Sequence, residues 1–371
     1  MNNIEEQFNL KISTNSNSNS TSISEHESNK SIDDLIPTNN NNNNNDNINN
    51  NESQNQISDN KLLSPNINSN NFSLFSLTKK VIISGLRNRK TSFMLQKVLN
   101  EAPKEQIDNI VKELKGNYWE LIREKNGNYF CSDLFKICDQ NQRIFILKEL
   151  TNTMSDDCTN KYANYPIQTL INFASSEQEY ELILNSFHDF KKLFYASFNS
   201  FGSYVIQKII ERIPEKFRLK FDLLFILIIP HLSLKQYGVC CVKKFVSSIK
   251  NEDLIDKIIN IILANFVQIA TNNYGNFVIQ FMLKKWVNTK YGNKIKRAIR
   301  DNFKLLYINK YSYYICDLYL MFSSKEEKEK LMTMNMLIFN GTNSSISSIP
   351  IYPIYNTNDI FINNINNINN Q

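Results

Sequence analysis

The chain has 371 residues with 42 Lys and Arg, 36 Asp and Glu, three His, six Cys and eight Gly, and a net charge of +6. Few histidines and the absence of any C-x-x-C argue against a catalytic triad, a metal site or a disulfide framework, and no glycine pattern for phosphate binding occurs. Without a leader pattern or a long apolar run, the sequence predicts a soluble, cytoplasmic, non-enzymatic protein that has no cofactor and contacts no membrane.

The first part of the chain, residues 1–71, is predicted to be a disordered arm rich in Asn and Ser. It contains 24 Asn, including an unbroken run from Asn39 to Asn45, and it has almost no aromatic residues. Residues 1–70 hold three Lys against nine acids, a net charge of −6, which leaves +12 on the remainder. Such a segment buries too little apolar surface to offset the entropy of ordering the chain.

Residues 72–340 contain an internal repeat, in which seven short segments such as FGSYVIQK (201–208) and YGNFVIQF (274–281) align. The third residues of these segments are separated by steps of 36, 36, 39, 36, 37 and 37 residues. The second position is always small, the fourth is usually aromatic, and apolar residues then recur at helical spacing. Helical units of this length stack to bury their apolar faces, so an all-α solenoid is predicted.

Three positions of each segment form a triplet that lies beside the apolar stripe of the helix, with its third and seventh residues on one face. The third positions are Ser92, Asn128, Asn164, Ser203, Val239, Asn276 and Tyr313. The fourth positions are Phe93, Tyr129, Tyr165, Tyr204, Cys240, Phe277 and Tyr314. The seventh positions are Gln96, Ser132, Gln168, Gln207, Lys243, Gln280 and Asp317.

A column of polar pairs that flank an aromatic residue suits single-stranded nucleic acid. Aromatic side chains stack on bases, and amides and hydroxyls hydrogen-bond the exposed base edges. Lysines near the triplets can bind phosphates, namely Lys97, Lys208, Lys243, Lys244, Lys284 and Lys285. From periodicity alone, a protein-binding scaffold of HEAT or armadillo type explains the repeat equally well.

The segments YGNFVIQ, FGSYVIQK, YANYPIQ and NGNYF resemble the RNA-reading helices of the Pumilio (PUF) repeat family, over residues 72–340. The resemblance implies a superhelical crescent that binds one RNA base per repeat, with the outer triplet residues at the base edge and the middle one stacking. It also implies a monomer that runs antiparallel to its RNA, binds 3′ untranslated regions of mRNA and recruits proteins for deadenylation or translational repression.

Carried over from the family, the pairs Asn164/Gln168 and Asn276/Gln280 imply uracil readers, and Ser92/Gln96 and Ser203/Gln207 imply adenine readers. Asn128/Ser132 keeps the stacking Tyr129 but lacks the glutamine. Val239, Cys240 and Lys243 depart from the pattern, so that position is expected to tolerate several bases. Asp317 implies a guanine preference, because a carboxylate accepts hydrogen bonds from guanine N–H groups.

The seventh unit is the last that the spacing reveals. An eighth triplet is expected near residues 349–350, where none is recognisable, and residues 323–339 are predicted to form a capping helix. Residues 341–371 are predicted to be a low-complexity tail. One alternative is a Pumilio-like nucleolar protein that binds structured RNA through backbone contacts in ribosome biogenesis, and another is a protein-binding scaffold.

Overall fold

The computed structural model describes residues 78–340, and the regular structure in this range is helical throughout. This confirms the predicted all-α class. The first helix, α2, spans Lys79–Arg87, and the last, α21, spans Lys325–Asn340, where the capping helix was predicted. Both predicted arms, residues 1–71 and 341–371, lie outside the described residues.

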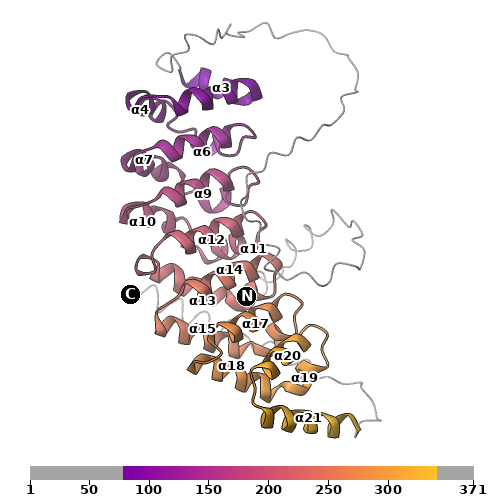
Figure 1. Ribbon diagram of the computed structural model, residues 1–371. Coiled ribbons are helices and arrows are strands. Elements are labelled where there is room, and N and C mark those ends of the chain that lie inside the picture. Colours follow the sequence, from indigo (N-terminus) through magenta and orange to yellow (C-terminus); the bar gives the residue numbers. More distant parts are fainter. Residues whose placement is uncertain (1–77, 341–371) are drawn as a thin grey trace, which may run out of the picture. The chain divides into compact units, whose positions relative to one another are not determined.

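Seven helices carry the predicted triplets and are called triplet helices here. They are α3 (Arg89–Asn100), α6 (Gly127–Ile137), α9 (Asn164–Phe173), α12 (Gly202–Arg212), α14 (Gln236–Ser248), α17 (Gly275–Trp286) and α20 (Tyr313–Met321). Each packs against the next in chain order, as the stack in Figure 1 shows. The seven units found in the sequence therefore stack as structural repeats.

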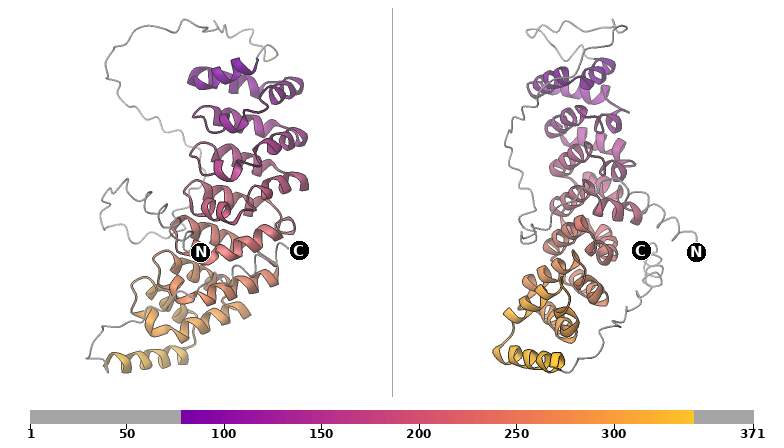
Figure 2. Two further views of the ribbon diagram at one scale, coloured as in Figure 1. Left: turned by 180° about the vertical axis from the view of Figure 1, so that it is seen from behind. Right: turned by 90° about the vertical axis from the view of Figure 1, so that its right-hand side faces the viewer.

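Each of the first six triplet helices is followed by a helix of a second row, which Figure 2 shows from two further sides. The second-row helices are α4 (Lys104–Glu113), α7 (Gln140–Leu150), α10 (Glu177–Asn185), α13 (Leu219–Ser233), α15 (Glu252–Ala264) and α18 (Lys290–Asp301). Short helices lead into the next repeat: α5 (Tyr118–Leu121), α8 (Met154–Asp157), α11 (Phe190–Phe198), α16 (Phe266–Ala270) and α19 (Phe303–Tyr307). A 3₁₀ turn, η3 (Glu215–Phe217), precedes α13.

A continuous hydrophobic core runs between the two rows, from Ile82 in α2 to Leu331 in α21. In α12 the apolar residues at one-and-four spacing, Val205, Ile206 and Ile209, are fully buried, as the sequence predicts. No repeat buries such a face alone, so each depends on its neighbours for stability. In the part of the chain that the structure describes, no helix is long and apolar enough to span a membrane.

The cysteines are free thiols, as predicted, and all except the half-buried Cys240 lie in the core. Burial is the main reason that the pKa values of Cys138 and Cys316 rise to about 12. Since the thiolate is the reactive form, these side chains act as small apolar packing groups at neutral pH.

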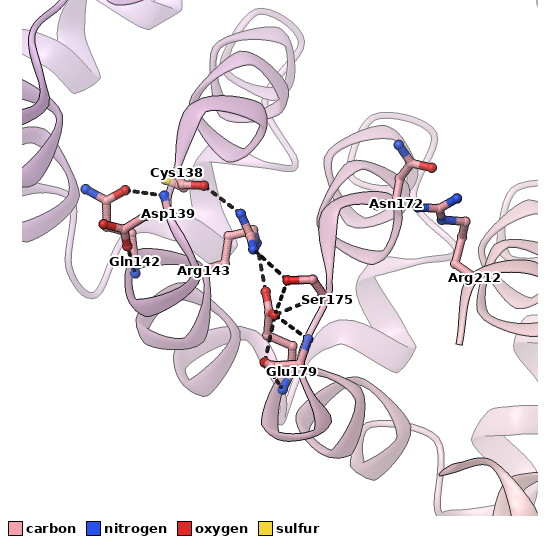
Figure 3. A network of polar contacts seen from close by, with 9 residues as sticks. Cys138, Asp139, Gln142, Arg143, Asn172, Ser175, Glu179 and Arg212 are labelled. Carbon is pink, nitrogen blue, oxygen red and sulfur yellow. Dashed lines mark hydrogen bonds and ion pairs between the residues drawn. The ribbon is translucent and has the colours of Figure 1, made fainter. Parts of the chain in front are cut away.

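Buried polar side chains connect successive second-row helices. The Arg143 guanidinium of α7 donates hydrogen bonds to the Cys138 carbonyl at 2.6 Å and to Glu179 Oε1 of α10 at 2.7 Å, as Figure 3 shows. Glu179 also accepts from the N–H groups of Ser175 at 3.0 Å and Ser176 at 2.9 Å, and so caps the start of α10. This network fixes the spacing of two repeats on the side of the stack away from the triplets.

Candidate nucleic-acid interface

The starts of the triplet helices need small residues because they pack against the end of the preceding helix. A Cβ atom on Gly202 would lie 2.5 Å from the carbonyl oxygen of Ala196, and one on Gly275 would lie 2.3 Å from that of Ile269. At the equivalent position of the last repeat, the Ser312 hydroxyl donates a 2.8 Å hydrogen bond to the Leu306 carbonyl. The small second position therefore sets how closely each triplet helix approaches its predecessor.

A recurrent asparagine, which the sequence reasoning missed, holds the turn before five of the triplet helices. It stands four residues before the third triplet position, at Asn88, Asn160, Asn199, Asn272 and Asn309. In the sixth unit, Asn272 Oδ1 accepts from the N–H groups of Tyr274 at 2.8 Å and Gly275 at 3.0 Å. The five positions are visible in the sequence at one fixed offset, so the repeat itself carried the signal.

The middle triplet residues form a ladder of side chains that is most exposed in the first repeats. Phe93 is 70% exposed, Tyr129 63%, Tyr165 59% and Tyr204 42%. In the later repeats Cys240 and Phe277 are half-buried, whereas Tyr314 is 55% exposed. Exposed aromatic rings at neighbouring repeats provide surfaces on which planar bases can stack.

The third triplet residues are buried, which corrects the expectation that both outer residues of a triplet lie on the surface. Their exposed fractions are 2% or less in the first six repeats, and only Tyr313, at 38%, is exposed. The Asn276 amide donates to the Asn272 and Asn273 carbonyls, both at 3.0 Å, and Asn128 and Asn164 bond the equivalent carbonyls. These side chains thus complete the helix start in the unbound protein.

The seventh-position glutamines are half-buried, and each donates a hydrogen bond to the third residue of its own triplet. Gln280 Nε2 donates to Asn276 Oδ1 at 2.8 Å, Gln168 Nε2 to Asn164 Oδ1 at 3.1 Å, and Gln96 Nε2 to Ser92 Oγ at 3.1 Å. Gln207 instead donates to the Ser203 carbonyl at 3.2 Å. Within residues 78–340 no hydrogen bond reaches the Oε1 atoms, so each glutamine retains an acceptor and one N–H for a ligand.

The second and fifth triplets present fewer groups to a base than the sequence suggested. The Ser132 hydroxyl donates to the Asn128 carbonyl at 2.8 Å, so its hydrogen is already used. Val239 is 1% exposed and has no hydrogen-bonding atom in its side chain, so its predicted place at a base edge would provide an apolar contact at most. In that repeat Lys243 Nζ lies 5.5 Å from the centre of the Phe281 ring, which provides a cation–π contact.

In the seventh triplet the Asp317 carboxylate lies beside the Tyr313 phenol. The negative charge of Asp317 is the main cause that raises the pKa of Tyr313, and Tyr307 adds to this effect. The rings of Tyr307 and Tyr313 are 5.2 Å apart, so Tyr313 lies between another tyrosine and the carboxylate. A base at this repeat would have to compete with Tyr313 for Asp317.

Several lysines predicted to bind phosphate are already paired. Lys208 and Lys244 share Glu211, at 3.5 Å and 3.0 Å, and Lys285 Nζ lies 5.9 Å from the Trp286 ring centre. Lys97 and Lys284 are exposed, and neither forms an ion pair among the residues that the structure describes. Residues 78–340 hold no cluster of three or more His, Cys, Asp or Glu that could bind a metal.

A model of the Pumilio-family RNA binding repeat matches residues 92–115, 158–185, 197–220 and 265–286. These segments contain the first, third, fourth and sixth triplets, which are the four that have glutamine at the seventh position. The three unmatched triplets are those that depart from the pattern in sequence and in geometry.

Two curated relatives are similar to this chain in sequence. The chain is 23% identical over 280 residues to a Pumilio domain-containing protein of Schizosaccharomyces pombe, covering 75% of this chain and 40% of the relative. It is 24% identical over 230 residues to Pumilio homolog 11 of Arabidopsis thaliana, covering 60% of this chain and 40% of the relative. The aligned regions thus span about two fifths of the length of both relatives.

Solved structures share the fold. The RNA-binding domain of Puf4, bound to a 3′ UTR recognition sequence of HO endonuclease RNA, matches with a TM-score of 0.61 and 22% identity, covering 70% of this chain and 79% of that one. The RNA-binding domain of yeast Puf5p, bound to AAT2 RNA, matches with a TM-score of 0.60 and 19% identity, covering 80% of both chains.

Proposed function

Because the chain belongs to the Pumilio repeat family, whose members act by binding RNA rather than by catalysis, we propose that its triplet face binds single-stranded RNA in a sequence-selective manner. One observation carries this proposal. Each of the four repeats that match the family model combines an exposed or half-buried aromatic ring with a glutamine that retains an acceptor and a donor. That combination can both stack on a base and discriminate its edge.

Stacking supplies most of the affinity in this proposal. Each base stacked on an aromatic side chain contributes roughly 1–3 kcal/mol, largely irrespective of base identity. The glutamines supply selectivity, because a base that cannot match them leaves the Oε1 acceptor and the second N–H of a half-buried amide without partners. A buried asparagine that fixes the glutamine, as in Asn276/Gln280 at 2.8 Å, reduces the entropy lost when the base is bound.

The base assignments differ between repeats. Asn164/Gln168 and Asn276/Gln280 are assigned to uracil, whose edge offers an acceptor and a donor side by side. Ser92/Gln96 and Ser203/Gln207 are assigned to adenine. Asp317 is assigned to guanine, and replacing it with Asn should then relax the base choice at that repeat.

In the cell we place the protein in the cytoplasm, where it would bind 3′ untranslated regions of mRNA as a monomer. Recruited proteins would then deadenylate the message or repress its translation. The Puf4 structure, which is bound to a 3′ UTR sequence, supports this target class. A backbone-binding role on structured RNA is the competing proposal, favoured by the buried, apolar Val239 in the fifth triplet.

Competition between RNA forms tests the proposal. The full chain would be titrated with a labelled 20-nucleotide RNA of random sequence, and unlabelled single-stranded or double-stranded RNA would be added. We expect single strands to compete at least tenfold better, because only unpaired bases can stack on the ladder. Equal competition by duplex RNA would favour the backbone-binding proposal, and a chain that binds neither form is a protein scaffold.

A further inference from the structure

A cleft lies at the first triplet, where α3 packs beside α6. It has a volume of 780 Å³, between α3 and α6, and its lining includes Phe93, Tyr129, Ser92 and Gln96. Two cations that precede the triplet, Arg89 and Lys90, also line it. Aromatic rings, a glutamine amide and two cations therefore line one cleft. This combination is complementary to a nucleotide, whose base can stack and whose phosphate is negatively charged.

The position of Arg89 is also occupied by a cation in the next two repeats. Arg89, Lys125 and Lys161 each stand three residues before the third triplet position, and all three side chains are exposed. The corresponding residues of the next three repeats are neutral: Ser200, Gln236 and Asn273. A cation returns only at Lys310 in the last repeat.

These three cations are available to a ligand, unlike several lysines beyond the triplets. Among residues 78–340, Arg89, Lys125 and Lys161 form no ion pair, and the Lys161 ammonium lies 4.8 Å from the centre of the Tyr162 ring. In contrast, Lys208 and Lys244 both lie against Glu211. A phosphate would have to displace Glu211 from those lysines, whereas it would meet Arg89, Lys125 and Lys161 without that cost.

The cation column coincides with the most exposed part of the aromatic ladder. Arg89 begins α3, Lys125 and Lys161 lie in the turns before α6 and α9, and these three helices carry the most exposed rings of the ladder. The ladder is broken at α14, where Cys240 replaces the ring. We infer that Arg89, Lys125 and Lys161 bind successive phosphates of the RNA, and that the N-terminal repeats anchor the strand. This inference rests on the proposed function and deepens it, because it assigns the phosphate contacts to one half of the same face.

Salt dependence tests the assignment. We would compare the wild-type chain with a triple variant, Arg89→Ala, Lys125→Ala and Lys161→Ala, binding a labelled single-stranded 20-nucleotide RNA of random sequence at 50–200 mM salt. Each phosphate contact contributes about 0.7 to the slope of log affinity against log salt, so the slope should fall by about 2. Affinity at the lowest salt should fall tenfold or more.

Two matched triple variants serve as controls. Lys112, Lys220 and Lys257 are exposed on the second-row helices, and their replacement by Ala should leave affinity within twofold of wild type. Replacement of Lys243, Lys284 and Lys310 in the later repeats should lower the slope by less than the first variant does. If either control lowers the affinity or the salt slope as much as the first variant does, the phosphate assignment is wrong but the proposed function stands. If the wild-type chain binds no RNA, the proposed function is wrong as well.

Discussion

At the scale of single residues, the third and seventh positions of a triplet work as a pair. The buried Asn276 amide bonds two carbonyls with its N–H groups and holds Gln280 with its oxygen at 2.8 Å. Asn276 thus has its hydrogen-bonding groups occupied in the unbound protein. Gln280 is half-buried and still has hydrogen-bonding groups that a base could use. The sequence showed that these residues share a helix face, but it did not show that Asn276 is buried against the loop whose carbonyls it bonds.

We expect Gln280→Ala to weaken binding by about 1–3 kcal/mol and to relax base choice at one position only, because one acceptor–donor edge is lost. Affinity would be measured on the RNA motif that the wild-type chain selects and on its single-base variants. Lys284→Ala is the matched control, since loss of an exposed cation should weaken all sequences alike. Indistinguishable profiles for the two variants would mean that Gln280 does not read a base.

The close approach at the helix starts makes a stability prediction. Gly275→Ala should lower the free energy of unfolding by about 1–3 kcal/mol, because its Cβ would lie 2.3 Å from the Ile269 carbonyl oxygen. Ala163→Gly, at the equivalent position just before α9, should cost no more than about 1 kcal/mol, mainly through the greater backbone entropy of glycine in the unfolded chain. Urea unfolding of both variants provides the comparison, and equal losses would show that the second position is not tightly packed.

At the scale of elements, a buried ion pair joins α7 to α10. Arg143 and Glu179 are 36 residues apart and are 8% and 0% exposed. No local pattern could have predicted this pair, because its two members come from different repeats and each helix carries two other charged residues. The capping boxes at Asp139/Gln142 and Ser176/Glu179, in contrast, follow a short spacing that the sequence displays.

Removing the cation of this buried pair should be costly. Arg143→Met is expected to lower the free energy of unfolding by about 3–5 kcal/mol, because Glu179 then remains buried without its counter-charge. Lys136→Met breaks an exposed pair with Asp133, at 2.9 Å, and should cost less than about 1 kcal/mol. Denaturant titrations of the two variants would distinguish them, and similar midpoints would contradict the structural role of Arg143.

The same pair predicts how stability depends on pH. Burial favours the neutral form of Glu179, but hydrogen bonds from Ser175, Arg143 and Ser176 outweigh it and lower its pKa from 4.5. The stability that the carboxylate contributes is therefore complete above pH 4.5 and is lost as the pH falls through the lowered pKa.

We expect the difference in Tm between wild type and Glu179→Gln to be largest above pH 4.5 and to narrow in more acidic solution. The exposed Glu181 lies on the same helix, and Glu181→Gln should give a small difference that does not change with pH. Thermal melts between pH 3 and 7 would show this, and a constant difference for Glu179→Gln would contradict the lowered pKa.

At the scale of the whole molecule, seven stacked repeats convert a local sequence pattern into a column of sites. The regular spacing of about 36 residues in the sequence was sufficient to predict the repeats, their helices and which helix of each repeat carries the triplet. The spacing could not predict how exposed the aromatic ring of each triplet is, because that exposure depends on packing between neighbouring repeats. Phe277 and Phe93 occupy the same triplet position, yet Phe277 is half-buried while Phe93 is 70% exposed.

Selection from a random single-stranded RNA pool with the full chain tests base-by-base reading most directly. The third and sixth triplets have the same Asn and Gln pair, so the account predicts an enriched motif with two uracils three positions apart. Repeating the selection with Gln168→Ala should remove the preference for one of these uracils and leave the other. Strong binding without any enriched motif would contradict the account, because the triplets would then not distinguish bases.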